Sequence, residues 1–184
     1  MDEKNQLVVK QSEYPHLFTE QIWPWGPVKT IFEPVEPPAT LISNVNIVPF
    51  DESGWLIICQ QIGWGIVGGT LEPSETYVET LTRELMEEAG CELVNFDVFG
   101  ALRMEFLTER PYRPHLPFPL SYRLLVVGEV RRVANPSNPE DGEHILEVAT
   151  FSLEETCQRL KKRPDDGMLL AEIYKYAAAF REKG

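Results

Sequence analysis

Three glutamates stand within two turns of one predicted helix, in the segment GGTLEPSETYVETLTRELMEEAGC that spans residues 68–91. Glu84 and Glu88 are four residues apart, a spacing at which like charges on a helix repel by roughly a few tenths of a kcal/mol. Glu87 adds a third negative charge beside them. A bound cation would turn this repulsion into attraction, so the spacing points to metal chemistry.

The positions of these acids around the helix strengthen that interpretation. At about 100° per residue, Leu81, Leu85 and Ala89 fall on one stripe about 80° wide, which we expect to face the core. Glu88 lies about 20° from Leu81, and Glu84 lies about 40° beyond Glu88. Two acids therefore border the buried face, where lost hydration adds to their repulsion. The simpler alternative is a solvated acidic face, but such faces usually lie opposite the core and alternate in sign.

Arg83 is the basic residue nearest to this group. It lies about 100° from Glu84 around the helix and four residues from both Glu79 and Glu87. We therefore expect Arg83 to hold Glu87, and Glu75 at the start of the helix, rather than to neutralise Glu84. A purely structural ion pair would explain Arg83 equally well.

Capping and periodicity predict the elements around this segment. Ser74 is the expected N-cap of the helix, which should run to Ala89 and end at Gly90. Alternating apolar residues and turn signals predict a hairpin before it, further strands after it and two amphipathic helices at the end of the chain. The expected strands span 40–50, 55–61, 92–106, 121–130 and 148–151, and the final helices begin near residues 153 and 166. This order predicts an α/β sandwich with a mixed sheet.

The segment resembles the signature box of the Nudix hydrolases, G-x5-E-x7-R-E-U-x-E-E-x-G-U, in which U is a bulky aliphatic residue. The matching positions are Gly69, Glu75, Arg83, Glu84, Leu85, Glu87, Glu88 and Gly90. Cys91 replaces the last aliphatic residue, and Val67 stands where many members have proline. The resemblance implies a Nudix-type α/β/α sandwich over residues 39–184 and does not cover residues 1–38.

The same resemblance implies hydrolysis of a diphosphate linkage in a nucleoside diphosphate derivative, with Mg²⁺ or Mn²⁺ as cofactor. ADP-ribose, a nucleotide sugar, a dinucleotide and a nucleoside triphosphate stay open as substrates. The implied metal ligands are Glu84, Glu87, Glu88 and the Gly68 carbonyl. A non-catalytic nucleotide-binding or metal-binding module on the same fold is the alternative.

The implied catalytic residues include Arg83 and a general base. The family uses either a box glutamate, here Glu84, or an acid from a later loop. That loop reads NPEDGEHILE and offers Glu140, Asp141, Glu143 and Glu147, of which Glu143 and Glu147 are preferred. A flexible acidic loop without a catalytic role is the alternative.

A locally basic stretch within residues 101–123 suggests where the substrate is held. Arg103, Arg113 and Arg123 could bind phosphate oxygens, and Tyr112 could stack on a base. An ordinary proline-stiffened loop would explain the same residues.

Composition limits the partners of this chain. The formal net charge of -12 opposes a nucleic acid polymer, because such partners require a basic surface. A small phosphorylated nucleotide is still compatible if a cation stands between the two negative partners. Three widely spaced cysteines, and the absence of a signal peptide and of a long apolar run, favour a cytoplasmic protein without a membrane partner.

The first 38 residues are rich in proline and tryptophan. Prolines at this density exclude a helix and permit at most short edge strands. We expect Trp23 and Trp25 to pack on the main domain or on a second copy in a homodimer. A stacking surface for a base is the alternative.

Overall fold

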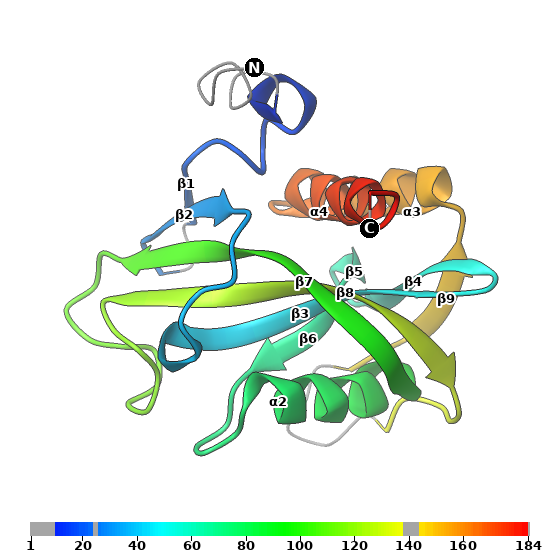
Figure 1. Cartoon of the computed structure of the whole chain (residues 1–184), viewed down its shortest axis with the longest axis horizontal. Coiled ribbons are helices and arrows are strands. Elements are labelled where there is room, and N and C mark those ends of the chain that lie inside the picture. Colours follow the sequence, from blue (N-terminus) through cyan, green and yellow to red (C-terminus); the bar gives the residue numbers. More distant parts are fainter. Residues whose placement is uncertain (1–9, 24–25, 138–143, 184) are drawn as a thin grey trace.

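The computed structural model describes residues 10–23, 26–137 and 144–183. Within them one mixed sheet is covered by helices on both faces (Figure 1). Its strands are β1 (Gln21–Trp23), β2 (Val28–Glu33), β3 (Ile42–Asp51), β4 (Gly54–Gln60), β5 (Gly63–Gly65), β6 (Val67–Thr70), β7 (Cys91–Phe106), β8 (Leu120–Arg132) and β9 (Glu147–Phe151). The helical elements are the 3₁₀ turn η1 (Ala39–Leu41), α2 (Tyr77–Glu84), the π turn η2 (Leu85–Ala89), α3 (Leu153–Leu160) and α4 (Gly167–Arg181). Residues 10–13 are also helical, so the expectation that prolines exclude a helix from the first 38 residues is wrong, because the first proline, Pro15, follows this helix.

The strand order is β1-β2-β7-β8-β3-β4-β5, with β6 paired to β3 and β9 paired to β4. Strands β3 and β8 are parallel, and the other strand pairs are antiparallel. The predicted hairpin is present as β3 and β4, with Phe50 opposite Trp55. The α/β sandwich with a mixed sheet is therefore confirmed.

Alternation along the strands divides the apolar residues between two cores. Val45 and Ile47 of β3 belong to the core beneath α2, whereas Val48 belongs to the core beneath α3 and α4. Figure 1 shows α2 on one face of the sheet and α3 with α4 on the other. Side chains of successive strand residues point to opposite faces, so each strand serves both cores.

Strand β2 is not the edge strand that the prolines predicted. It pairs with β1 on one side and with β7 on the other, and β1 forms the edge of the sheet. The reason is positional: Pro27 and Pro34 flank β2 without entering it. The backbone amides inside β2 can therefore donate hydrogen bonds on both sides.

The segment before β1 packs on the main domain. Leu17 and Phe18 are 1% and 4% exposed and belong to the core beneath α3 and α4. Glu172 of α4 accepts hydrogen bonds from the backbone N–H groups of His16 and Leu17 at 2.8 and 2.9 Å and contacts His16 Nδ1 at 2.6 Å. The Trp23 ring lies against the same core. Trp25 lies outside the described residues, and a homodimer contact stays a prediction.

Within the described part of the chain, no helix has both the length and the apolar character needed to cross a membrane.

Replacing Glu172 with Gln should loosen the N-terminal segment. Hydrogen bonds to a charged acceptor contribute about 1.5–3 kcal/mol each, and Gln turns one acceptor into a donor that faces backbone N–H groups. We expect the free energy of unfolding in urea to fall by about 2 kcal/mol, and the amides of His16 and Leu17 to exchange faster. Glu182→Gln, at the exposed C-cap of the same helix, is the control. Unchanged exchange at both amides would contradict this role of Glu172.

Candidate active site

The acidic helix begins at a capping box. Thr76 is the N-cap: its hydroxyl accepts from the Glu79 N–H, and the Glu79 carboxylate accepts from the Thr76 N–H at 2.7 Å. The predicted N-cap, Ser74, is wrong, because Ser74 lies in the preceding turn at a positive φ of 72°. The T-x-x-E spacing of Thr76 and Glu79 in the sequence is the signal that identifies the true cap.

The predicted apolar stripe and the end of the helix are confirmed. Leu81, Leu85 and Ala89 are all 0% exposed, and Gly90 ends the helix in the left-handed conformation. The last turn is η2, in which Gly90 N–H is shared between the Leu85 carbonyl, five residues back, and the Met86 carbonyl at 3.1 Å. Single π turns inside α-helices often occur at functional sites. A π turn also holds more residues than an α turn, so the predicted angle between Glu84 and Glu88 no longer applies to this helix.

Both edge glutamates lie against the backbone of β6. Gly68 N–H donates to Glu88 Oε2 at 2.9 Å. A Cβ atom at Gly69 would collide with the Glu84 carboxylate. At Gly68 a Cβ would overlap the Val45 carbonyl oxygen, and its φ of 144° also favours glycine. The paired glycines therefore let two carboxylates and one strand meet in direct contact.

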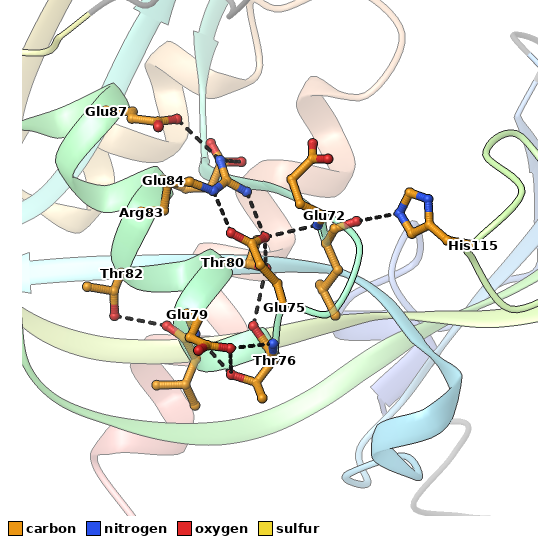
Figure 2. A network of polar contacts seen from close by, with 12 residues as sticks. Glu72, Glu75, Thr76, Glu79, Thr80, Thr82, Arg83, Glu84, Glu87 and His115 are labelled. Atoms are coloured by element: carbon orange, nitrogen blue, oxygen red, sulfur yellow. Dashed lines mark hydrogen bonds and ion pairs between the residues drawn. The ribbon is translucent and has the colours of Figure 1, made fainter.

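Arg83 is the centre of an ion-pair network (Figure 2). Its guanidinium donates to both oxygens of Glu75 at 2.8 and 3.1 Å and to Glu87 at 3.2 Å, as predicted. It also donates to Glu84 at 2.9 Å, so the expectation that it leaves Glu84 alone is wrong. The backbone angle between the two residues is large, but both side chains are long enough for their ends to meet. Glu79 is held by the capping box instead.

The pKa values of Glu75 and Glu84 shift in opposite directions, because the two carboxyl groups have different surroundings. The Arg83 hydrogen bonds lower the pKa of Glu75 from 4.5 to about 2. Burial raises the pKa of Glu84, although Arg83 opposes this change. The Glu84 side chain is 13% exposed and that of Glu87 is 32% exposed. Added positive charge would therefore stabilise Glu84 more than its neighbours.

The donor set at this place fits a hard divalent cation. Glu84, Glu87, Glu88 and the Gly68 carbonyl offer only oxygen atoms, the ligands that Mg²⁺ and Mn²⁺ prefer. Across residues 10–23, 26–137 and 144–183, no three His, Cys, Asp or Glu side chains are gathered as a complete metal-binding group. Glu84, Glu87 and Glu88 therefore do not converge into a complete ligand set in this structure, and water and substrate phosphates would supply the remaining ligands of an ion.

The later acidic loop does not supply a described general base. Glu140, Asp141 and Glu143 lie outside the described residues. Glu147 is the exposed first residue of β9 and pairs with Cys59. Its neighbour Val148 belongs to the core beneath α2. By strand alternation, the Glu147 side chain therefore lies on the face opposite Glu84 and Glu88.

Two cavities lie beside β3. The first, here the loop cavity, has a volume of about 320 Å³ and is lined by Asn44, Thr70, Phe106, Tyr112, Ser121 and Arg123 among others. The second, here the hairpin cavity, has a volume of about 600 Å³ and is lined by Trp23, Asn46, Leu102, Arg123, Asp166 and Leu169 among others. Thr70 follows the paired glycines, and Asn46 pairs with Gly68 across the sheet. Both cavities therefore adjoin the strand that contacts the glutamates.

The predicted substrate residues are only partly brought together. Arg123 lines both cavities and Tyr112 lines the loop cavity. Arg113 lies over the Tyr112 ring and pairs with Glu72 at 2.8 Å, which ties this loop to the box. Arg103 lines neither cavity.

Arg103 lies on the other face of the sheet. Its neighbour Leu102 pairs with Arg123 and faces the hairpin cavity, so Arg103 points away from it. Arg103 contacts Glu33 at 4.0 Å and Glu105 at 3.6 Å.

Sequence reasoning missed Asn44 and Asn46 as cavity residues. They alternate within the otherwise apolar strand ISNVNIVPF, and that alternation of polar residues was the available signal.

Glu75→Gln should make stability less dependent on acid pH. Because the pKa of Glu75 is lowered to about 2 by folding, its contribution is fully present above 4.5 and is lost as pH falls toward 2. We expect native protein to exceed Glu75→Gln by about 2 kcal/mol in free energy of unfolding at pH 7, and by less than about half of that at pH 3. Urea unfolding at both pH values measures the difference. Glu182→Gln, at an exposed position at the end of α4, is the control. A difference that stays constant from pH 7 to pH 3 would show that Arg83 does not lower the Glu75 pKa.

Comparison with known structures supports the fold. A mutant of the Bacillus subtilis pyrophosphohydrolase BsRppH matches with a TM-score of 0.63 and 15% identity, covering 91% of this chain and 98% of that chain. A NUDIX hydrolase from Nitrosomonas europaea matches with a TM-score of 0.55 and 18% identity, covering 76% of this chain and 90% of that chain. A comparison with curated proteins gives no match.

The sequence itself decides the family. The family model described as NUDIX domain matches residues 40–173, which is well over half of the chain. This span contains the capped acidic helix, the paired glycines and the Arg83 network described above. The chain therefore belongs to the NUDIX domain family.

Proposed function

We propose that this protein hydrolyses a diphosphate linkage in a nucleoside diphosphate derivative, with Mg²⁺ or Mn²⁺ as cofactor. ADP-ribose, a nucleotide sugar, a dinucleotide and a nucleoside triphosphate all contain such a linkage. One observation carries the proposal: Glu84 and Glu88 are both packed against the Gly68–Gly69 backbone. Two carboxylates held against glycine backbone offer oxygen ligands for an ion that substrate phosphates can share.

The residues of the site have two roles: some would bind the ion, and Arg83 positions the carboxylates that do so. Glu84 and Glu88, with Glu87 and the Gly68 carbonyl, would hold the ion. When bound, Mg²⁺ or Mn²⁺ supplies Lewis acidity at phosphate oxygens and lowers the pKa of a bound water. Arg83 contacts Glu84 and Glu87 and so fixes the direction of both carboxylates.

The hydrolytic step needs a proton acceptor. Water oxygen forms a bond to phosphorus, the bond to the bridging oxygen breaks, and the proton of the water passes to a carboxylate. We assign this role to Glu84 or to Glu143. Glu147 is disfavoured by its place on the opposite face of the sheet.

A hydrolysis screen tests the proposal. Nucleoside triphosphates, dinucleotides, nucleotide sugars and ADP-ribose would be incubated with the protein and Mg²⁺ or Mn²⁺, and the products identified by chromatography. We expect one substrate class to be cleaved at its diphosphate linkage. Binding of nucleotides without any product across the panel would instead favour the non-catalytic binding module.

Glu84→Gln and Glu88→Gln should each abolish this hydrolysis while the protein stays folded. Gln keeps the shape but loses the charge that binds the ion, and we expect kcat/KM to fall more than about 100-fold. The measurement is product release under saturating metal, with circular dichroism as the test of folding. Glu79→Gln removes one charge from the same helix and should keep full activity. Unchanged turnover in both site variants would refute the assignment.

Metal binding should also be visible without any substrate. A ligand at 100 times its Kd stabilises the folded state by about 2.7 kcal/mol. For a chain of this size that corresponds to a rise in Tm of about 5 °C in saturating Mg²⁺ or Mn²⁺. Glu88→Gln should lose most of this rise, whereas Glu79→Gln should keep it. A native protein with no response to either ion would favour a purely structural acidic helix.

A further inference from the structure

Arg123 carries a charge that forms no ion pair within the described part of the chain, although the Asp166 carboxylate interacts with it electrostatically. It lies on β8, and its Nε is buried without a hydrogen-bond partner in the described part of the chain. No ion pair to its guanidinium forms among those residues. Buried arginine side chains are almost always paired, because an uncompensated charge is costly away from water. The missing partner is therefore best sought in the space that Arg123 borders.

The hairpin cavity is that space, and it is the larger of the two cavities described above. Apolar side chains form most of its wall, with Ile22, Leu102 and Leu169 among them. Its volume of about 600 Å³ is within the range of pockets that hold small organic ligands. Asn46 lines it and pairs with Gly68 across the sheet. The cavity therefore lies against the same strand pair as the glutamates, but on the face of α3 and α4 rather than on the face of α2.

Trp23 contributes an aromatic side chain to the wall of the cavity. It comes from a part of the chain that the family model does not match. Its ring lies over the Arg123 guanidinium, 5.3 Å from centroid to Cζ. Residues 40–173 match the NUDIX domain, and Trp23 belongs to the hairpin before them. A ring stacked on a guanidinium covers one of its faces and leaves the N–H donors in its plane available.

The remaining charges in the wall disfavour a phosphate as the occupant. Arg163 is already held by Asp166 and by Gln60, each at 2.8 Å. Asp165 and Asp166 then place two carboxylates in the wall that also holds Arg123. A phosphate would meet both of them. A neutral ring that accepts hydrogen bonds from Arg123 and donates others toward the aspartates fits this arrangement.

We propose that the hairpin cavity binds the base of the substrate and that Arg123 selects a purine carrying adjacent O6 and N7 acceptors, such as guanine, over adenine. Arginine donates to this pair of acceptors in a bidentate geometry. Adenine places an amino donor at the first of the two positions, and arginine has no acceptor to offer it. The inference rests on the proposed function, because it takes the ligand to be a nucleotide whose phosphates lie at Glu84 and Glu88.

The test measures binding without metal and without turnover. Calorimetric titrations of the full chain in EDTA would use GMP, AMP, 7-deaza-GMP and inorganic phosphate. We expect GMP to bind at least about tenfold more tightly than AMP. The ligand 7-deaza-GMP lacks the N7 acceptor and should lose most of that advantage. Inorganic phosphate should not compete with GMP.

Protein variants test the contact between Arg123 and the base by changing the protein instead of the ligand. Arg123→Lys keeps the charge but loses the two-donor fork, so the ratio of GMP to AMP affinity should fall below about threefold. Arg131→Lys changes an exposed arginine of the same strand and should keep the native ratio. Thermal unfolding confirms that each variant is folded. The 7-deaza-GMP comparison needs no variant and decides the question even if Arg123→Lys does not fold.

Four results would overturn the proposal. They are AMP binding as tightly as GMP, 7-deaza-GMP binding as tightly as GMP, a folded Arg123→Lys that keeps the native ratio, and competition by inorganic phosphate. The last result would assign Arg123 to a phosphate. Failure of the proposed function looks different: no member of the substrate panel is hydrolysed with metal, whatever the affinities measured in EDTA.

Discussion

The contact between the backbone of Gly68–Gly69 and the carboxylates of Glu84 and Glu88 organises the rest of this structure. It exists only because position 69 has no side chain, since a Cβ there would occupy the place of the Glu84 carboxylate. The apolar stripe of the helix presses these acids onto the sheet, because Leu81 and Leu85 are completely buried beneath it. The same packing that stabilises the fold therefore desolvates the groups that the chemistry needs.

Arg83 makes this crowding of acids tolerable. One guanidinium contacts Glu75, Glu84 and Glu87, so it offsets part of the repulsion among them. The network is asymmetric: Glu75 receives two hydrogen bonds and its pKa falls, whereas burial prevails at Glu84 and its pKa rises. Glu88 accepts a hydrogen bond from the Gly68 N–H of the strand. The arrangement thus holds every acid in place and leaves the deepest one with incomplete compensation.

Local patterns predicted the parts of this protein that depend on local interactions. Periodicity predicted the stripe of Leu81, Leu85 and Ala89, and turn residues predicted the β3–β4 hairpin. The cap was missed although its T-x-x-E signal is local, because the serine two residues earlier was preferred. The Arg83–Glu84 contact could not be read from backbone angles, since long side chains reach beyond them.

The residues that choose a substrate are harder to predict for a physical reason. Trp23, Asn46 and Arg123 come from three strands, and only the sheet order brings them to one cavity. The signature box contains none of them, so it can specify the chemistry without specifying the base. A strand pair, Gly68 with Asn46, joins the two places. Substitutions in the N-terminal hairpin, such as at Trp23, can therefore change which base is bound while the geometry of the glutamates stays the same.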